Sequence, residues 1–283
     1  MPQFSIALIT DSACDLPPTL LEALQIHVLP FGINYQDGQF LDRVDIQPED
    51  IYARLPVEIP TTSMPTPGAV LALLDQLKAE GYKQVLAIHI SSSLSGTWQM
   101  VQTIASQYEG LDIRVFDSRS LSFGQGFLLL EAARMLRSGQ TDLDTIWQRL
   151  VHLRDTSRVF FILDTLEYLH RGGRIGAVSA FLGQMLNLKP IISVDKEGKY
   201  FSFTKVRGKK LGLKELLKIG EQLAKETPCR LAVLHGAAEA EARELYKKLK
   251  ELPTVVESFL EQISPALGIH TGPGLVGFVF CEA

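Results

Sequence analysis

The sequence predicts an α/β protein of two domains, with a Rossmann-like parallel sheet in the first domain and a mixed α/β fold in the second. Short apolar runs alternate with amphipathic segments over the first half of the chain, which is typical of a parallel sheet covered by helices. Two strand-like runs meet at Glu197-Gly198 in the second half, which indicates a hairpin. The 283 residues, 46% of them hydrophobic, are enough for two cores. We place the domains at 1–157 and 158–283.

The first domain is predicted from apolar, β-branched runs and from amphipathic stretches that follow them. Asp15 is the expected N-cap of the first helix, and Thr141-x-x-Asp144 the expected capping box of the last. The predicted strands are 4–10, 28–35, 84–90 and 112–117, and the predicted helices are 17–24, 68–80, 98–107, 126–139 and 141–155.

The second domain is predicted to begin with a strand at 158–164 and a helix of small residues at 175–187. The hairpin is expected over 189–208. The remaining predictions are helices at 211–225 and 238–252 and strands at 230–236, 254–260 and 274–282.

The composition excludes several classes of protein. The net charge of −4 and the 21% of charged residues are ordinary for a globular chain. The three cysteines lie far apart, which indicates neither a disulfide framework nor a zinc site. The N-terminus lacks the pattern of an export signal, and runs such as Val85–Ile88 are too short to cross a bilayer. We expect a cytoplasmic protein without a metal, a cofactor or stable membrane insertion.

Four polar loops are predicted at strand ends or irregular turns. They are 10–15, 60–68, 91–96 and 117–126, and loops that end parallel strands gather at the carboxyl edge of the sheet. Their hydroxyls, together with helix N-terminal amides, can form an uncharged cradle for a carboxylate or phosphate. Helix capping and turn formation are the alternative for any one loop. Asp11, Asp15 and Asp117 together are an alternative cation site.

The second half carries basic and turn motifs that suit an anion. Residues 170–210 hold nine Lys or Arg against two acids, a net +7 that leaves −11 for the rest of the chain. Arg171 and Arg174 flank paired glycines, and His270 and Thr271 precede a Gly-Pro-Gly turn. All four can donate hydrogen bonds to an anion. A solvated surface, an acidic partner or nucleic acid are the alternatives.

Motifs of other chemistries are absent from the sequence. There is no Gly-x-Ser-x-Gly elbow, no phosphate-loop or dinucleotide motif, and no His-Glu-x-x-His motif. An acyl hydrolase that uses Ser93 and His270 remains an alternative, as does a nucleic-acid-binding regulator that uses residues 170–210.

Eight motifs in order resemble the DegV family of bacterial lipid-binding proteins over essentially the whole chain. They are ALITDSACDLP (7–17), PTTSMPTPG (60–68), SSSLSGTWQ (91–99), VFDSRSLSFGQG (115–126), DTLEYLHRGGRIG (164–176), LNLKPIISV (186–194), KVRGKK (205–210) and HTGPGLVGFVF (270–280). The resemblance implies a non-enzymatic protein with one long-chain fatty acid, such as palmitate, buried between two domains. It also implies a partner fatty acid kinase that receives the acyl carboxylate.

The resemblance also implies roles for particular residues. The carboxylate would be held by Thr62, Ser63, Ser93, Ser95, Gly96, His270 and Thr271, with Arg207 as a nearby charge. Arg171 and Arg174 would face the partner or a phosphate. From the apolar segment 177–192 we expect tunnel walls at Phe181, Leu182, Met185 and Leu186, with core packing as the alternative.

Overall fold

The computed structural model describes residues 6–140, 142–181, 188–225 and 227–283. The elements of the first half are β1 (Ile6–Asp11), η1 (Ser12–Cys14), α1 (Pro18–Ala23), β2 (Ile26–Leu29), β3 (Gly32–Tyr35), β4 (Gly38–Leu41), α2 (Pro48–Arg54), β5 (Thr61–Ser63), α3 (Pro67–Ala79), β6 (Gln84–His89), α4 (Thr97–Ala105), β7 (Asp112–Asp117), α5 (Phe123–Arg137) and α6 (Leu143–Thr156). Within these ranges no helix is long and apolar enough to cross a membrane.

The elements of the second half form the other lobe of the molecule. They are β8 (Arg158–Ile162), α7 (Glu167–Arg171), η2 (Gly176–Phe181), β9 (Leu188–Val194), β10 (Tyr200–Arg207), α8 (Lys209–Leu223), β11 (Cys229–Gly236), α9 (Glu239–Leu249), β12 (Val255–Gln262), α10 (Pro265–Thr271) and β13 (Leu275–Glu282).

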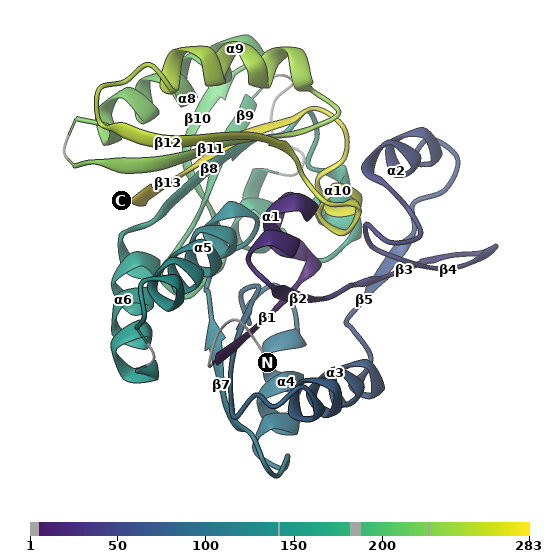
Figure 1. Cartoon of the computed structure of the whole chain (residues 1–283). Helices are drawn as coiled ribbons and strands as arrows, with labels where there is room; N and C mark the ends of the chain where they lie inside the picture. Colours follow the sequence, from purple (N-terminus) through teal and green to yellow (C-terminus); the bar gives the residue numbers. More distant parts are fainter. Residues whose placement is uncertain (1–5, 141, 182–187, 226) are drawn as a thin grey trace.

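The first half contains the predicted parallel sheet, in the order β2-β1-β6-β7. Its central strands β1 and β6 are buried because both faces of the sheet are covered. Alternate residues such as Ala7 and Ile9 face α3 and α4, whereas Ile6 and Leu8 face the other way, toward α5. Figure 1 shows α3 and α4 on the outer side of this sheet.

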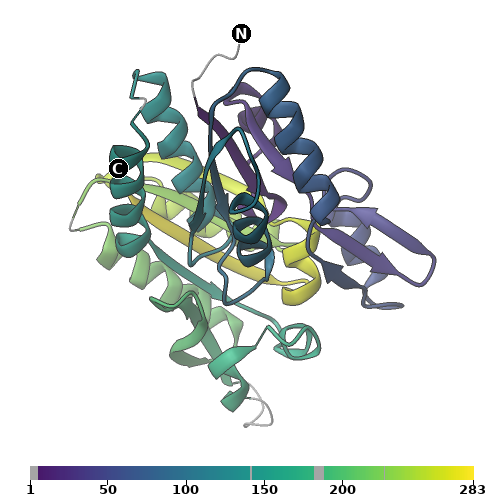
Figure 2. The ribbon, with the colours of Figure 1, turned by 90° about the horizontal axis from the view of Figure 1, so that it is seen from below.

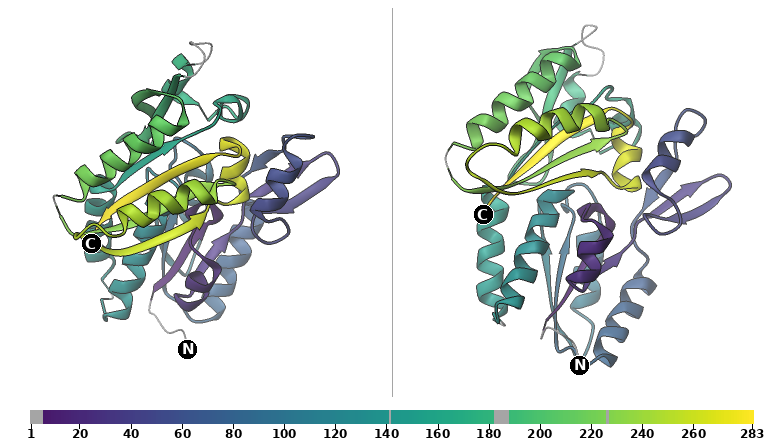
Figure 3. Two further views of the ribbon diagram at one scale, coloured as in Figure 1. Left: turned by 90° about the horizontal axis from the view of Figure 1, so that it is seen from above. Right: turned by 45° about the horizontal axis from the view of Figure 1, so that its top comes forward.

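The second half forms a mixed sheet in the order β10-β9-β8-β13-β11-β12, in which only β11 and β12 pair in parallel. Helices α8 and α9 cover its outer face (Figure 3, right). The predicted hairpin is confirmed, with β9 and β10 joined through the turn at Gly198. The last helix of the first half, α6, ends at Thr156, and the first strand of the second sheet, β8, begins at Arg158. The division into domains at 1–157 and 158–283 stays a prediction.

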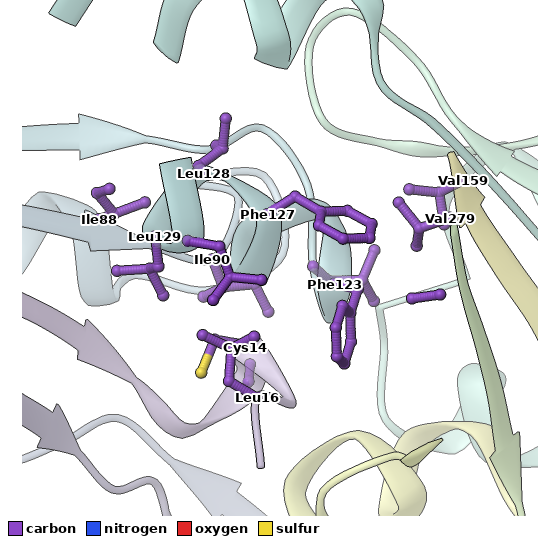
Figure 4. Close-up of a cluster of buried hydrophobic side chains, with 14 of the residues drawn as sticks. Cys14, Leu16, Ile88, Ile90, Phe123, Phe127, Leu128, Leu129, Val159 and Val279 are labelled. Atoms are coloured by element: carbon purple, nitrogen blue, oxygen red, sulfur yellow. The ribbon is translucent and has the colours of Figure 1, made fainter. Parts of the chain in front are cut away.

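Helix α5 lies between the two sheets and joins the lobes through apolar contacts (Figure 4). Its Leu129 lies beside Ile88 of the parallel sheet, whereas Phe123 lies on the side of Val159 and Val279. All five side chains belong to one buried cluster. The largest part of the core is therefore the seam itself, so anything bound there is shielded from water by both lobes.

A three-stranded sheet, β4-β3-β5, projects from the first half (Figure 2). The predicted strand 28–35 is wrong, because β2 ends at Leu29 and β3 begins at Gly32 in this separate sheet. Pro30 stands at the break and has no amide hydrogen for a ladder. The small sheet carries β5, and with it Thr62, toward the second lobe.

Three further local predictions differ from the structure. Asp15 does not cap α1, because its carboxylate is buried and accepts hydrogen bonds from Ser122 Oγ and Ser264 N. Helix α6 is capped by Asp142 instead of the predicted box, and Thr141 lies outside the described residues. The predicted helix 175–187 is a 3-10 helix over Gly176–Phe181 in its described part.

Candidate functional site

The carboxyl edge of the parallel sheet is organised by a buried carboxylate. Asp11 accepts hydrogen bonds from Ile90 N at 3.0 Å and Gln125 Nε2 at 3.2 Å, and it lies 2.9 Å from His89 Nδ1. Asp117 likewise accepts from Ser92 Oγ at 2.6 Å. These acids fix the loops, and in the described ranges no group of three or more His, Cys, Asp or Glu could hold a metal.

Helix α10 brings the histidine motif of the second lobe to this edge. It begins at Ser264, a favourable N-cap followed by Pro265 in the first turn. The Asp15 carboxylate accepts a hydrogen bond from Ser264 N at 2.7 Å, and Arg43 Nη2 lies 3.5 Å from the same carboxylate. Burial raises the pKa of Asp15, while the Arg43 charge opposes that rise. The first lobe therefore fixes the start of the helix that ends at His270 and Thr271.

A polar cavity of about 40 Å³ lies where α10 meets the first lobe. Thr62 Oγ1 lies 2.9 Å from His270 Nε2 in its wall. Ser95 and Arg174 also face the cavity. The remaining lining residues are Ala13, Phe31, Ile90, Leu94, Tyr200, Ala266, Leu267 and Thr271. The cavity therefore combines four hydroxyl-bearing residues, an imidazole and a guanidinium with apolar side chains.

His270 is neutral at physiological pH. Burial, and then the nearby Arg174 charge, lower the pKa of His270 to about 4. Gly172 makes room for the ring, because a Cβ there would lie 2.1 Å from His270 Nδ1. Nδ1 has no hydrogen-bond partner in the part of the chain that the structure describes.

An apolar cavity of about 30 Å³ adjoins the polar one along the seam. Tyr200, Leu267 and Thr271 line both cavities. The apolar cavity extends past residues of both lobes, namely Leu121, Ser122, Val159, Phe160, Phe161, Leu234, Ile263, Leu275, Gly277 and Phe278. Val159 and Phe160 also line a wider cleft of about 580 Å³ beyond it. Three hollows in series thus follow the seam from His270.

The structure brings together only some of the predicted carboxylate residues. Thr62, Ser95, His270 and Thr271 line the polar cavity. Gly96 stands next to it as the N-cap of α4, where a Cβ would meet Met64 Sδ at 2.8 Å. The Thr271 hydroxyl donates a hydrogen bond to Leu267 O at 3.0 Å. Its hydrogen is therefore already used, and Thr271 contributes to the cavity wall rather than a free donor.

Ser63, Ser93 and Arg207 do not line the polar cavity. Ser63 is exposed, and its hydroxyl accepts from Asn34 Nδ2 at 3.3 Å. Ser93 Oγ donates to Glu197 O, and Arg207 is exposed at the end of β10. Neighbouring residues of β5 point to opposite faces of the strand, which explains why Thr62 lines the cavity and Ser63 does not.

The residues predicted to face a partner or to line the tunnel lie in different places in the structure. Arg171 is 60% exposed and pairs with Glu167 one helical turn away. Arg174, expected to face a partner, lines the polar cavity instead. Phe181 lies in an open groove with Phe201 and Phe203. Leu182, Met185 and Leu186 lie outside the described residues.

Tyr200 and Leu267 are site residues that the sequence reasoning missed. Both line the two cavities of the seam. The Ser264-Pro265 pair indicates the start of a helix, so the sequence could have predicted α10 and the position of Leu267 within it. Tyr200 carried no such signal, because its place depends on how the hairpin docks on the other lobe.

These features define a class: a two-lobed α/β protein with a hydroxyl- and imidazole-lined cavity beside an apolar one between its sheets. The family model described as "Uncharacterised protein, DegV family" matches residues 5–283. A DegV domain-containing protein of Clostridium acetobutylicum is 41% identical over 278 residues, 97% of this chain and 98% of the relative. The chain therefore belongs to the DegV family.

Two solved structures share the fold over nearly their full length. The fatty acid binding protein DegV of Bacillus subtilis has a TM-score of 0.92 at 30% identity, covering 99% of this chain and 100% of its own. A DegV family protein from Thermus thermophilus, described for its fatty acid binding, has a TM-score of 0.91 at 34% identity, covering 98% and 99%. Both resemble this chain along its whole length.

Proposed function

We propose that this protein binds one long-chain fatty acid in the seam between its lobes. The observation that carries the proposal is the polar cavity at Thr62 and His270, which shares Tyr200, Leu267 and Thr271 with a neighbouring apolar cavity. A carboxylate needs a few donors, and an acyl chain needs a dry apolar channel. The fatty acid binding of the similar B. subtilis and T. thermophilus proteins supports the same ligand class.

Within this proposal the carboxylate lies among Thr62, Ser95 and His270. The hydroxyls donate hydrogen bonds, and the neutral imidazole donates through whichever nitrogen carries the proton. Arg174 supplies the positive charge that Arg207 was expected to supply. Neutral donors suffice because they avoid the cost of burying a fixed cation.

Most of the affinity comes from the chain rather than from the head group. Burying roughly fifteen methylenes at about 0.8 kcal/mol each contributes a gross ~12 kcal/mol. Loss of motion on binding removes several kcal/mol of that. The remainder still corresponds to a submicromolar Kd, so the polar cavity serves mainly to orient the carboxyl group.

We further propose that the protein presents the carboxyl end to a partner kinase in the cytoplasm, without metal or cofactor of its own. Arg174 is exposed as well as cavity-lining, so the head-group end lies near the surface. Arg171, close by in sequence, pairs with Glu167 but is exposed, so a partner can reach it. The cysteines Cys14, Cys229 and Cys281 are buried free thiols, which fits a reducing compartment.

The geometry disfavours the hydrolase alternative. Ser93 Oγ is hydrogen-bonded to Glu197 O, and His270 Nε2 is paired with Thr62. A nucleophile and its base would instead bond to each other. The nucleic-acid alternative is weakened by ion pairs between the basic segment and acids outside it, such as those of Lys209 with Asp164 and Glu241.

The test is a titration of delipidated protein with radiolabelled palmitate. We expect saturation at one fatty acid per chain with a submicromolar Kd, and no turnover of a chromogenic acyl ester. An absence of palmitate binding contradicts the proposal. Ester hydrolysis that Ser93→Ala abolishes favours the hydrolase instead.

A further inference from the structure

The two cavities of the seam have room for only a few waters, because a water needs roughly 10–15 Å³ of such space. Uptake of a long acyl chain therefore requires part of the wall to move. One wall segment with few ladder pairs to the rest of its sheet is the β9–β10 hairpin, which is also tied to β8 by the hydrogen bond from Ser193 Oγ to Val159 O. It pairs with itself at seven positions but with β8 at only two, Phe160 to Ser193 and Phe161 to Ile192.

The tip of this hairpin is held by side chains of the other lobe. Ser91 Oγ donates to Gly198 O at 2.9 Å, and Ser93 Oγ donates to Glu197 O at 2.7 Å. Arg119 Nη1 donates to Lys196 O at 3.4 Å. The three acceptors are backbone carbonyls of consecutive residues, so the contact does not depend on the side chains of the tip.

The tip fits closely against Ser91 at one glycine. Gly198 has a φ of +79°, and a Cβ there would lie 2.0 Å from Ser91 Oγ and 3.0 Å from Arg119 Cα. A larger residue at this position would have to push the tip away from the first lobe. The glycine is therefore needed both for the turn and for the contact between lobes.

The tip is also rigid enough to move as a unit. Asp195 N donates to Lys199 O at 2.9 Å, and Gly198 N donates to Asp195 O at 3.0 Å. The Asp195 carboxylate accepts from Glu197 N at 3.0 Å and from Lys199 N at 2.9 Å. Releasing the tip therefore displaces the residues that follow it.

The residue two positions after Gly198 is the wall of the seam. Tyr200 lines both cavities, whereas Phe201, on the opposite face of the strand, lines the 580 Å³ cleft. Strand β10 thus separates the cleft from the cavities. Moving the tip away from Ser91 would open the apolar cavity into the cleft.

We propose that Ser91 and Ser93 are positioning residues that latch the β9–β10 hairpin, and that release of this latch lets the acyl chain enter and leave the seam. This inference rests on the proposed fatty acid binding. The latch holds Tyr200 against the ligand in the closed state. Opening must precede both uptake and release, so the latch controls both rates while leaving the closed complex unchanged.

The predicted signature is a change of rates without a matching change of affinity. Each lost hydrogen bond favours the open hairpin by about fivefold, so the double variant Ser91→Ala/Ser93→Ala should raise both association and dissociation rates by at least about tenfold. The Kd should change by less than about threefold, because both rates scale with the same opening equilibrium. Damage to the cavity itself would raise the dissociation rate and the Kd together.

The experiment measures stopped-flow binding and release of cis-parinaric acid, a fluorescent fatty acid. Ser92→Ala is the matched control, because Ser92 lies between the two serines but donates to Asp117 in its own lobe. Gly198→Ala unlatches the tip by a different route and should exchange ligand as fast as the double variant. Ser93→Thr keeps the hydroxyl and should exchange more slowly than Ser93→Ala.

Hydrogen exchange in ligand-free protein supplies a readout that does not need the fatty acid. Peptides covering residues 195–203 should exchange faster in the double variant and in Gly198→Ala than in wild type and Ser92→Ala. Unchanged exchange and unchanged rates in the double variant overturn the latch. If wild type does not bind the probe, the proposed function fails, and faster exchange then supports only the mechanical part of the inference.

Discussion

Thr62 Oγ1 and His270 Nε2 lie 2.9 Å apart although 208 positions separate them in the chain. The contact joins β5 of the small projecting sheet to the end of α10 in the second lobe. Because the imidazole is neutral, either member of the pair can accept the hydrogen bond between them, and the pair keeps a hydrogen that it can donate to a bound carboxylate. Each of the two residues therefore reports on the head-group end of the proposed site.

Replacing Thr62 by valine removes the hydroxyl but keeps the shape of the side chain. A typical hydrogen bond contributes about 0.5–1.5 kcal/mol, so we expect the Kd for palmitate to rise roughly twofold to tenfold. Ser63→Ala is the control, because the Ser63 hydroxyl contacts Asn34 rather than the cavity. Equal effects of the two variants on palmitate affinity would contradict the placement of the carboxylate.

The lowered pKa of His270 predicts a pH-dependent contribution to stability. Between about pH 4 and 6.5 the unfolded chain binds a proton that the folded chain does not, so this contribution is complete above about pH 6.5 and is lost as the pH falls. Wild type should lose up to about 1.4 kcal/mol per pH unit relative to His270→Gln in this window. Urea unfolding of both proteins from pH 4 to 8 measures the difference, and a constant difference refutes it.

Arg174 and Arg207 make a matched pair of exposed arginines. Only Arg174 faces the polar cavity. We expect Arg174→Gln to raise the Kd for palmitate roughly fivefold, a modest effect because solvent screens the exposed charge. Arg207→Gln should leave the Kd unchanged, and the reverse order would restore the role first assigned to Arg207.

Asp42 is buried beside Ser12, which donates to it at 2.6 Å. Burial raises the pKa of Asp42 to about 7, so the folded protein holds a proton between about pH 4 and 7 that the unfolded chain releases. Stability should therefore fall as the pH rises through this window, by at most about 1.4 kcal/mol per unit. Asp42→Asn should remove this loss, and thermal unfolding of both proteins at pH 5 and 8 checks it. An equal pH dependence in the two proteins speaks against a protonated Asp42.

Arg171 separates ligand binding from partner contact. Its side chain is exposed, pairs with Glu167 and lines neither cavity. We expect Arg171→Ala to bind palmitate as wild type does and to reduce acyl phosphate formation when a fatty acid kinase and ATP are added. Loss of palmitate binding in Arg171→Ala would show that this loop holds the ligand.

The sequence predicted the parallel sheet and the hairpin because their signals are local. Buried strands such as β6 are short apolar runs bounded by polar loops. Gly198 indicates the turn of the hairpin, because glycine readily adopts a positive φ. The break at Pro30 was equally local but was passed over, since the apolar residues on both sides read as one strand. The small sheet that contains β5 was therefore missed.

The candidate site could be predicted by loop, but only in part by residue. Ser93 and Ser95 lie in the same hydroxyl-rich loop, yet one holds the hairpin tip and the other faces the polar cavity. Which side chain points inward depends on backbone angles and on how the lobes dock, and neither is encoded in residue type. For the same reason the sequence did not show that Arg174, rather than Arg207, lines the polar cavity.

Carbon-13 NMR of bound palmitate labelled at its carboxyl carbon tests most directly whether the carboxylate lies against the hydrogen-bonded pair of Thr62 and His270. We expect one bound resonance, distinct from that of free palmitate, that shifts in Thr62→Val and in His270→Gln but not in Ser63→Ala or Arg207→Gln. A bound resonance that none of these substitutions shifts would contradict this placement of the carboxylate.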